Sequence, residues 1–350
     1  MEPVMNQPTL PRPDIEALLA LLRGEDPGRP VQFEFWLNDR LERRLAPDLD
    51  SADPITRRMT AYARGGYDVV PMVLSDFAFP RRTQQSGATI SQNAYAMITD
   101  RAAFEAYPWP DPDAADERNL TQAVAALPQG MGLAAVAPDG VLENVTELVG
   151  FERLCELTMD DPDLVDEIFA AVGSRILRYY QRMLRCPQVR IVMGNDDWGH
   201  KGGTMLSPRM MRRWVLPWHE RIVAEAHAAG RPAILHSCGR VAPLMDEVID
   251  GLHYDGKHSQ EDVIEPVEEA IGRWGSRIAI IGGIDVDFLC RAGADAVRAR
   301  AEALLRTTAG RRYALGSGNS IPGYVPDEAW AAMVGPALER RGLEVRLSAA

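Results

Sequence analysis

Ile234-Leu235-His236-Ser237-Cys238-Gly239 is typical of a short buried strand that ends in a histidine and a cysteine two residues apart. Alternate side chains of a strand share one face, so His236 and Cys238 are predicted to point at the same place. An imidazole and a thiolate that converge at a strand end are suitable zinc ligands, although a complete site needs three or four. A buried thiol beside a hydrogen-bonded histidine is the structural alternative.

Seven further segments have the apolar, β-branched character of strands, and helical patterns separate the eight. The predicted strands are 31–36, 67–74, 132–137, 190–193, 233–235, 252–256, 278–281 and 313–315. The predicted helices are 14–23, 55–64, 115–127, 148–158, 162–184, 208–229, 241–249, 264–274, 292–307 and 328–341. Repeated strand–helix units favour parallel pairing and an α/β fold, a (β/α)8 TIM barrel. An open doubly wound sheet is the alternative, disfavoured because no GxGxxG follows the first strand.

The predicted organisation is one domain with two additions. Residues 1–28 form an N-terminal arm and helix, and residues 29–345 form the barrel. Residues 77–113 have no clear period and are predicted to be an insertion after the second strand, lying over the active-site face, with a short hairpin near 88–98.

Composition excludes several classes of protein. The net charge is -12 and the pI about 5.1, which argues against a nucleic-acid partner. No apolar run reaches the roughly 18 residues of a membrane span, and the first residues lack the apolar core of a signal peptide. The four cysteines are widely spaced with no CxxC, so a reducing cytoplasm is the expected location.

Residues able to act as ligands, acids or bases follow nearly every predicted strand, and in such barrels the C-terminal strand ends carry the chemistry. They are Glu34, Asp76, Asp139, Asp196, Asp197, His236, Cys238, His258, Asp285 and Asn319. Asp196 or Asp197 is a candidate general base, and His258 is the favoured further ligand, with Asp255 and Glu261 as other candidates. Capping of helices and loops by the aspartates and by His258 explains the same pattern. Trp36 is a candidate pocket residue, with core packing as the alternative.

From about Arg29 to Arg340 the chain resembles the uroporphyrinogen decarboxylase superfamily. The resemblance is strongest in Asp196-Asp197-Trp198-Gly199, Ser207-Pro208, Leu235-His236-Ser237-Cys238-Gly239 and Gly282-Gly283-Ile284-Asp285. It implies a (β/α)8 barrel and one of two chemistries. Decarboxylase members act on a tetrapyrrole without a metal. Methyltransferase members bind zinc through an HxC and a distant cysteine, and exchange a methyl group with a corrinoid on a partner protein.

The chain departs from both patterns. The arginine-rich RQAGR segment of the decarboxylases is replaced by Gln32–Asn38, whereas Ser75-Asp76-Phe77 is similar to their motif with a pyrrole-binding aspartate. Asn319 stands where the methyltransferases have their third, cysteine ligand. The resemblance therefore favours a divergent methyltransferase or O- or N-demethylase of a small methylated compound. A metal-free decarboxylase of a porphyrinogen or smaller acid is the close alternative, and a non-catalytic binding protein comes third.

On this hypothesis the predicted site falls into three groups. The metal ligands are His236, Cys238 and His258. The catalytic residues are Asp196, Asp197 and Asp76, and the substrate-binding residues are Glu34, Trp36, Asp285 and Asn319. The implied partners are a small-molecule substrate and a corrinoid-binding protein, and the resemblance also implies a homodimer.

Overall fold

The computed structural model of the protein describes residues 11–49, 53–81 and 96–348. The chain divides into two compact units that both draw on distant parts of the sequence. Unit 1 comprises Met1–Pro71, Leu120–Ala134 and Asp255–Ala350, and unit 2 comprises Met72–Asn119 and Ala135–Tyr254. No described helix has the length and apolarity that a bilayer crossing requires.

Unit 1 contains four strands in the order β1 (Val31–Gln32), β10 (Tyr313–Leu315), β9 (Ala279–Ile281) and β8 (Gly256–His258). Each neighbouring pair is parallel, with Val31 opposite Ala314 and His258 opposite Ile281. Every residue of these strands is buried. Continuous burial is typical of parallel strands whose two faces are both covered.

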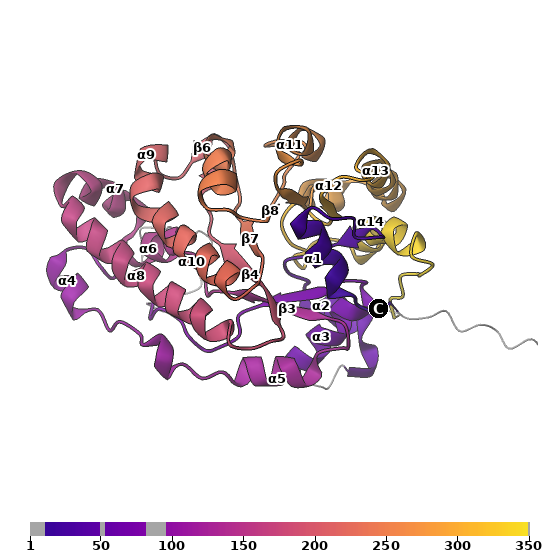
Figure 1. Ribbon diagram of the computed structural model, residues 1–350, viewed down its shortest axis with the longest axis horizontal. Helices are drawn as coiled ribbons and strands as arrows, with labels where there is room; N and C mark the ends of the chain where they lie inside the picture. Colours follow the sequence, from indigo (N-terminus) through magenta and orange to yellow (C-terminus); the bar gives the residue numbers. More distant parts are fainter. Residues whose placement is uncertain (1–10, 50–52, 82–95, 349–350) are drawn as a thin grey trace, which may run out of the picture. The chain divides into compact units, whose positions relative to one another are not determined.

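The helices of unit 1 have defined ends. They are α1 (Ile15–Arg23), α2 (Asp39–Leu45), α3 (Pro54–Arg64), α11 (Val267–Trp274), α12 (Val286–Arg291), α13 (Ala294–Thr307) and α14 (Asp327–Glu339). In α1, the Asp14 side chain accepts from the Glu16 amide and Gly24 ends the helix with a φ of 79°. Helices α13 and α14 lie side by side (Figure 1), joined at the surface by the Arg298–Glu339 ion pair.

In unit 2 the long strand β4 (Val189–Asn195) pairs in parallel with β7 (Ala233–His236). The register places Asn195 opposite His236, so the C-terminal ends of the two strands meet at one edge. The strands β2 (Val69–Met72) and β3 (Gly132–Val136) each begin in unit 1 and end in unit 2, and they follow β4 in the sheet order β7-β4-β3-β2. A two-stranded hairpin, β5 (Gly199–His200) and β6 (Gly203–Thr204), follows β4.

Among the helices of unit 2, α10 (Leu216–Ala228) packs against both strands of this pair. The others are α4 (Arg101–Ala106), α6 (Val141–Val149), α7 (Phe151–Asp160), α8 (Pro162–Met183) and α9 (Pro208–Met210), with the π-helical turns η3 (Met211–Val215) and η5 (Glu247–Gly251). Helix α5 (Arg118–Ala126) begins in unit 2 and ends in unit 1. Helices α8 and α10 lie along each other (Figure 1). Gly173 permits this approach, because a Cβ atom there would lie 2.1 Å from the Trp218 ring.

The α/β class and the eight predicted strands are confirmed, with four corrections to local structure. The helix predicted at 241–249 is instead a 3-10 turn, η4 (Ala242–Leu244), followed by the π-helical turn η5. Strand β8 spans Gly256–His258 rather than 252–256, because the π-helical turn η5 holds the chain until Gly251. The helix predicted at 148–158 is instead two helices, α6 and α7, separated at Gly150, whose φ is 83°. The helix predicted at 208–229 contains the π-helical turn η3.

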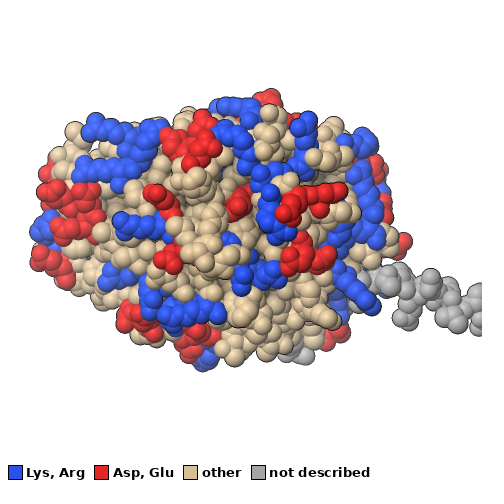
Figure 2. Space-filling model, viewed as in Figure 1, with Lys and Arg blue, Asp and Glu red and all other residues tan. Residues whose placement is uncertain are grey.

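Part of the predicted insertion 77–113 is described. It contains the short helix α4, while the hairpin predicted near 88–98 lies mostly outside the described residues. On the face drawn in Figure 2, acidic and basic side chains are intermixed.

Candidate functional site

The ends of β4 and β7 bring together the donor atoms of three side chains. His236 is the last residue of β7, Cys238 lies two positions beyond it, and Asp197 follows β4. One ligand atom from each lies within 4.8 Å of the other two. Cys238 Sγ is 3.9 Å from His236 Nε2, and the Cys238 amide donates to Asp197 Oδ1 at 3.0 Å. The predicted convergence of His236 and Cys238 is therefore found in the structure.

These residues suit a zinc ion in donor type and in spacing. With zinc bond lengths of about 2.3 Å to sulfur and 2.0–2.1 Å to nitrogen, a tetrahedral site separates these two atoms by about 3.6 Å. The separation here is 3.9 Å, so a small adjustment of side chains would admit the ion. An N, S, O donor set leaves one position open, which is characteristic of catalytic rather than structural zinc. Asp197, predicted as a catalytic residue, is thus the third donor of the group.

Asp196, the neighbour of Asp197, is fully buried and held by several partners. Its amide donates to the His236 carbonyl at 2.9 Å, which extends the β4–β7 pairing by one residue. Its carboxylate accepts from the amides of Leu142 and Glu143 at the N-terminus of α6, each at 3.0 Å. Helix N-termini stabilise negative charge. These contacts favour a positioning role for Asp196, in which it holds the strand end that carries Asp197.

A buried chain of side chains continues from Asp196. His219 Nε2 lies 3.0 Å from Asp196 Oδ2, and His219 Nδ1 lies 2.7 Å from the Tyr254 hydroxyl. Two glycines make room for this chain: a Cβ atom at Gly140 would lie 2.2 Å from Asp196 Oδ1, and one at Gly194 would lie 2.1 Å from the Tyr254 hydroxyl. His219 and Tyr254 were not predicted as site residues. The available sequence signal is a histidine on the apolar face of the helical pattern at 208–229, which is weak.

Glu143 is a further residue that the sequence analysis missed. Burial and the charges of Asp196 and Asp197 raise the pKa of Glu143 to about 9, so it carries a proton at neutral pH. Its Oε2 accepts from the Gly140 amide at 2.9 Å. The sequence signal is a Gly-x-x-Glu spacing after a predicted strand, which resembles a capping box.

The loop after β3 and helix α6 each place one acidic side chain beside the same arginine. Arg81 donates to Asp139 Oδ2 at 2.7 Å and to Asn144 Oδ1 at 2.8 Å, and also pairs with Glu147. Asp139 has a φ of 62°, a left-handed conformation that is uncommon outside glycine. Burial raises the pKa of Glu147. This edge of unit 2 is therefore predominantly acidic.

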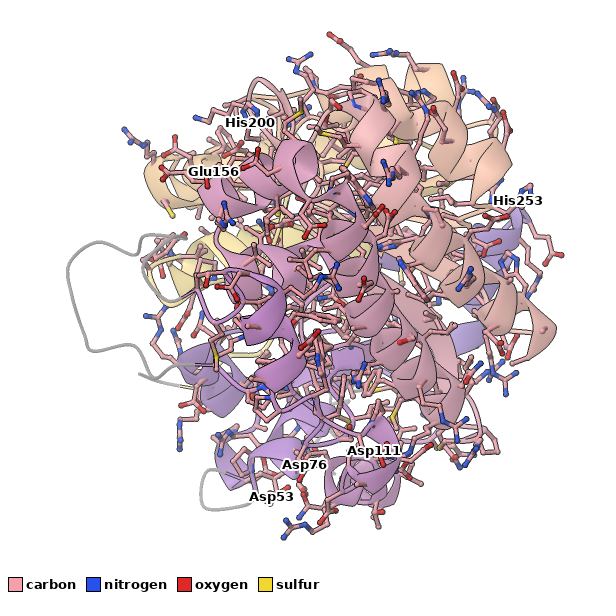
Figure 3. The ribbon with its side chains drawn as sticks, turned by 90° about the vertical axis from the view of Figure 1, so that its left-hand side faces the viewer. Asp53, Asp76, Asp111, Glu156, His200 and His253 are labelled. Atoms are coloured by element: carbon pink, nitrogen blue, oxygen red, sulfur yellow. The ribbon has the colours of Figure 1, made fainter. Side chains whose placement is uncertain are left out.

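Asp76, a predicted catalytic residue, is exposed and belongs to a local turn. Its carboxylate accepts from the Asp116 amide at 2.7 Å, and its own amide donates to the Asp116 carbonyl. Figure 3 shows Asp76 close to Asp111 and at the opposite end of unit 2 from His200. Asp197, His236 and Cys238 form the candidate metal-ligand group. His200 adjoins this group, because its carbonyl accepts from the Arg240 amide, two residues beyond Cys238. The structure therefore does not bring Asp76 to this group.

The remaining predicted residues lie in unit 1, where Glu34 is the most unusual. Its carboxyl group is 1% exposed, and it accepts from the Ser317 hydroxyl at 2.7 Å and the Ser317 amide at 3.3 Å. Burial raises the pKa of Glu34 to about 8, against the opposing effect of the Ser317 hydrogen bonds. His258, on β8, packs against Phe33 and Phe35 at ring-centroid distances of 5.2 and 6.1 Å.

Trp36, Asp285 and Asn319 have more ordinary surroundings. Trp36 is half-buried under the Arg58 guanidinium, 5.0 Å from its ring centroid. Asp285 caps α12, accepting from the Asp287 amide at 2.7 Å. Asn319 is half-buried in the loop after β10. Among the described residues, the converging ligand atoms are those of Asp197, His236 and Cys238, and the role of His258 as a ligand stays a prediction.

Comparisons with known proteins give one family and one related fold. A family model described as uroporphyrinogen decarboxylase (URO-D) matches residues 119–338. The fold is similar to that of a methyltransferase from Methanosarcina mazei, with a TM-score of 0.66 over 92% of this chain and 97% of that chain, at 16% sequence identity. No curated protein sequence gives a significant match. The residues matched by the family model include Asp197, His236 and Cys238.

Proposed function

Since this chain belongs to the uroporphyrinogen decarboxylase family, we propose that it is a zinc-dependent methyltransferase or demethylase that exchanges a methyl group with a corrinoid carried by a partner protein. The observation that carries the proposal is the convergence of Asp197, His236 and Cys238 at the ends of two neighbouring strands. The related fold of a methyltransferase is in keeping with it. We further propose that the strands close into a (β/α)8 barrel forming one domain, with 77–113 as an insertion.

In this proposal each residue of the group has a defined task. His236 Nε2, Cys238 Sγ and the Asp197 carboxylate would hold the zinc ion. The bound ion supplies Lewis acidity, which lowers the pKa of a thiol or hydroxyl substrate. The Cys238 amide occupies Asp197 Oδ1 and so orients the carboxylate. Asp196, anchored by His219 and the start of α6, keeps the two strand ends in register.

Glu143 is the proposed proton reservoir, because burial and the neighbouring Asp196 carboxylate favour its protonated form. In unit 1, Glu34, Trp36, Asp285 and Asn319 stay proposed substrate contacts, and His258 stays a proposed further ligand. Glu34 would meet a substrate as a neutral acid near pH 7.

A metal-free decarboxylase is the second candidate, favoured by the family model itself. Decarboxylation of a polycarboxylate substrate calls for several cationic partners. The edge around β3 and β4 instead carries Asp139, Glu147 and Asp197, with Arg81 already paired to two carboxylates. Like-charge repulsion therefore makes this candidate the weaker one.

Zinc binding by the purified protein tests the choice between the methyltransferase and the metal-free decarboxylase. We expect the wild type to bind one zinc ion tightly, and Cys238→Ala to lose more than the roughly 10- to 100-fold in affinity that outer-shell substitutions cost. Cys155→Ala, at an exposed cysteine, is the matched control and should bind as the wild type does. Zinc affinity is measured by competition with a chromogenic chelator, and methyl transfer by the absorbance change of methylcobalamin.

Two results would reject the methyltransferase. One is equal, negligible zinc affinity in the wild type and in Cys238→Ala. The other is turnover of a porphyrinogen, measured by chromatography of the products, that persists in the His236→Ala variant.

A further inference from the structure

Unit 1 contains a cavity at the N-terminal ends of β1 and β10, the strand edge opposite to Glu34 and Ser317. Its volume is about 430 Å³, and it is lined by residues 24–27, 29–31 and 308–313 together with Leu21, Leu305 and Arg340. This volume falls within the range of about 300–1,000 Å³ typical of small-molecule sites. The C-terminal ends of α1 and α13 form part of its wall.

The lining is rich in arginine. Four guanidinium groups face two carboxylates: Arg29, Arg311, Arg312 and Arg340 against Glu25 and Asp26. Arg29 is already paired with Asp68 at 2.7 Å, and Glu25 is already paired with Arg23 at 2.7 Å. Within the part of the chain that the structure describes, none of the other three arginines makes an ion pair. The cavity therefore has an excess of positive charge.

Arg312 has the most restricted position of the three. Its guanidinium donates to the Leu22 carbonyl at 2.5 Å and the Arg277 carbonyl at 3.0 Å, while its buried Nε has no hydrogen-bond partner among the described residues. It lies against Gly24, where a Cβ atom would be 3.3 Å from it. Burial lowers the pKa of Arg312, because the charged form loses solvation. The charge of Asp255 offsets part of this effect, and an anion bound beside the half-buried guanidinium would offset more of it.

Arg340 and Arg311 have free donors at the rim. Arg340 uses one N–H to reach the Leu305 carbonyl at 3.0 Å, near the end of α13. The Arg311 side chain is exposed and makes no hydrogen bond to any described residue. A guanidinium has five N–H donors, so most of the donors of these side chains stay available. Backbone carbonyls thus hold the side chains of Arg312 and Arg340 in place, and both side chains keep further N–H donors for a ligand.

We infer that this cavity binds a small molecule bearing an oxyanion, a phosphate or a carboxylate group, held by Arg311, Arg312 and Arg340. Guanidinium groups match both oxyanions through paired N–H donors. The inference is independent of the proposed methyl transfer, since in (β/α)8 barrels chemistry takes place at the other strand edge. The ligand is therefore an accessory molecule rather than the substrate.

Calorimetric titration of the full chain with inorganic phosphate, and separately with malonate, tests the inference at constant ionic strength. We expect saturable binding of at least one anion. Arg311→Gln and Arg340→Gln should each weaken it about tenfold, the loss of one charge-assisted hydrogen bond. Arg306→Gln is the matched control: it removes the same charge from α13 at a side chain that is 65% exposed and outside the cavity.

Each outcome of the titrations either supports or rejects an anion site in this cavity. Saturable binding of phosphate that malonate does not displace identifies a phosphorylated ligand, and the reverse identifies a carboxylate; either supports the site. Absence of saturable binding for both anions overturns it. Equal weakening by Arg306→Gln and Arg311→Gln also overturns it, because the effect would then come from net charge. Circular dichroism of each variant confirms that the fold is retained.

Discussion

The substitution Glu34→Gln should change how the stability of the protein depends on pH. Glu34 is buried at the end of β1, and its hydrogen-bonding partner Ser317 lies just beyond β10. Glutamine has the same shape as the protonated acid, with one acceptor oxygen for the Ser317 hydroxyl and a donor at the other position. The variant removes the titration of Glu34 and also one hydrogen bond, because the glutamine NH2 group cannot accept from the Ser317 amide. That second loss does not depend on pH and leaves the slope of the comparison unchanged.

The magnitude follows from the two pKa values. The folded state holds the proton to a pKa of about 8, whereas the unfolded chain releases it near the ordinary value of 4.5. The folded state therefore binds more protons between these values, and the free energy of unfolding falls as pH rises through this window. The stabilisation is complete below about pH 4.5. By pH 8 the loss approaches about 5 kcal/mol, at 1.36 kcal/mol for each pH unit.

Urea unfolding at a series of pH values between 5 and 9 measures the effect. We expect the stability of Glu34→Gln minus that of the wild type to rise with pH and to level off above about pH 8. Glu269→Gln, at an exposed glutamate of the same unit, serves as the control and should give no such slope. A difference between Glu34→Gln and wild type that stays constant with pH would refute the reasoning.

Two further substitutions test the support of the metal-ligand group. Gly140→Ala should destabilise the protein by about 1–3 kcal/mol in urea unfolding, since its Cβ would meet Asp196 Oδ1 at 2.2 Å. Gly272→Ala, where an added Cβ has open space on α11, should instead be neutral or stabilising, and equal losses in both would contradict the expected clash. His219→Gln should weaken zinc binding about 10-fold or more in chelator competition, because Asp196 loses a partner that orients the strand end. The exposed His227→Gln on the same helix is its control, and unchanged affinity in both variants would show that His219 is only a packing residue.

Local sequence pattern was sufficient to predict the strands and the convergence of one pair of candidate ligands. The alternation of side chains along a strand is a property of the backbone, so His236 and Cys238 could be paired from their spacing alone. The eight strands could likewise be predicted from the sequence, because their apolar runs recur between helical patterns. The helix break at Gly150 and the π-helical turn before β8 could not be predicted from local pattern. The φ of 83° at Gly150 and the late start of β8 depend on how the surrounding segments pack.

The tertiary structure decided which of the many polar strand ends meet. Asp197 joins His236 and Cys238 because β4 and β7 pair with Asn195 opposite His236, a register set by contacts between segments about 40 residues apart in sequence. In the sequence, Asp76 follows a predicted strand just as Asp197 does. In the structure, its carboxylate accepts a hydrogen bond within a surface turn. The high pKa of Glu34 and of Glu143 likewise arises from burial by distant segments. Short-range periodicity thus determined the elements and their polar ends, whereas the environment of each side chain, and with it its charge and its partners, depended on strand register and helix packing.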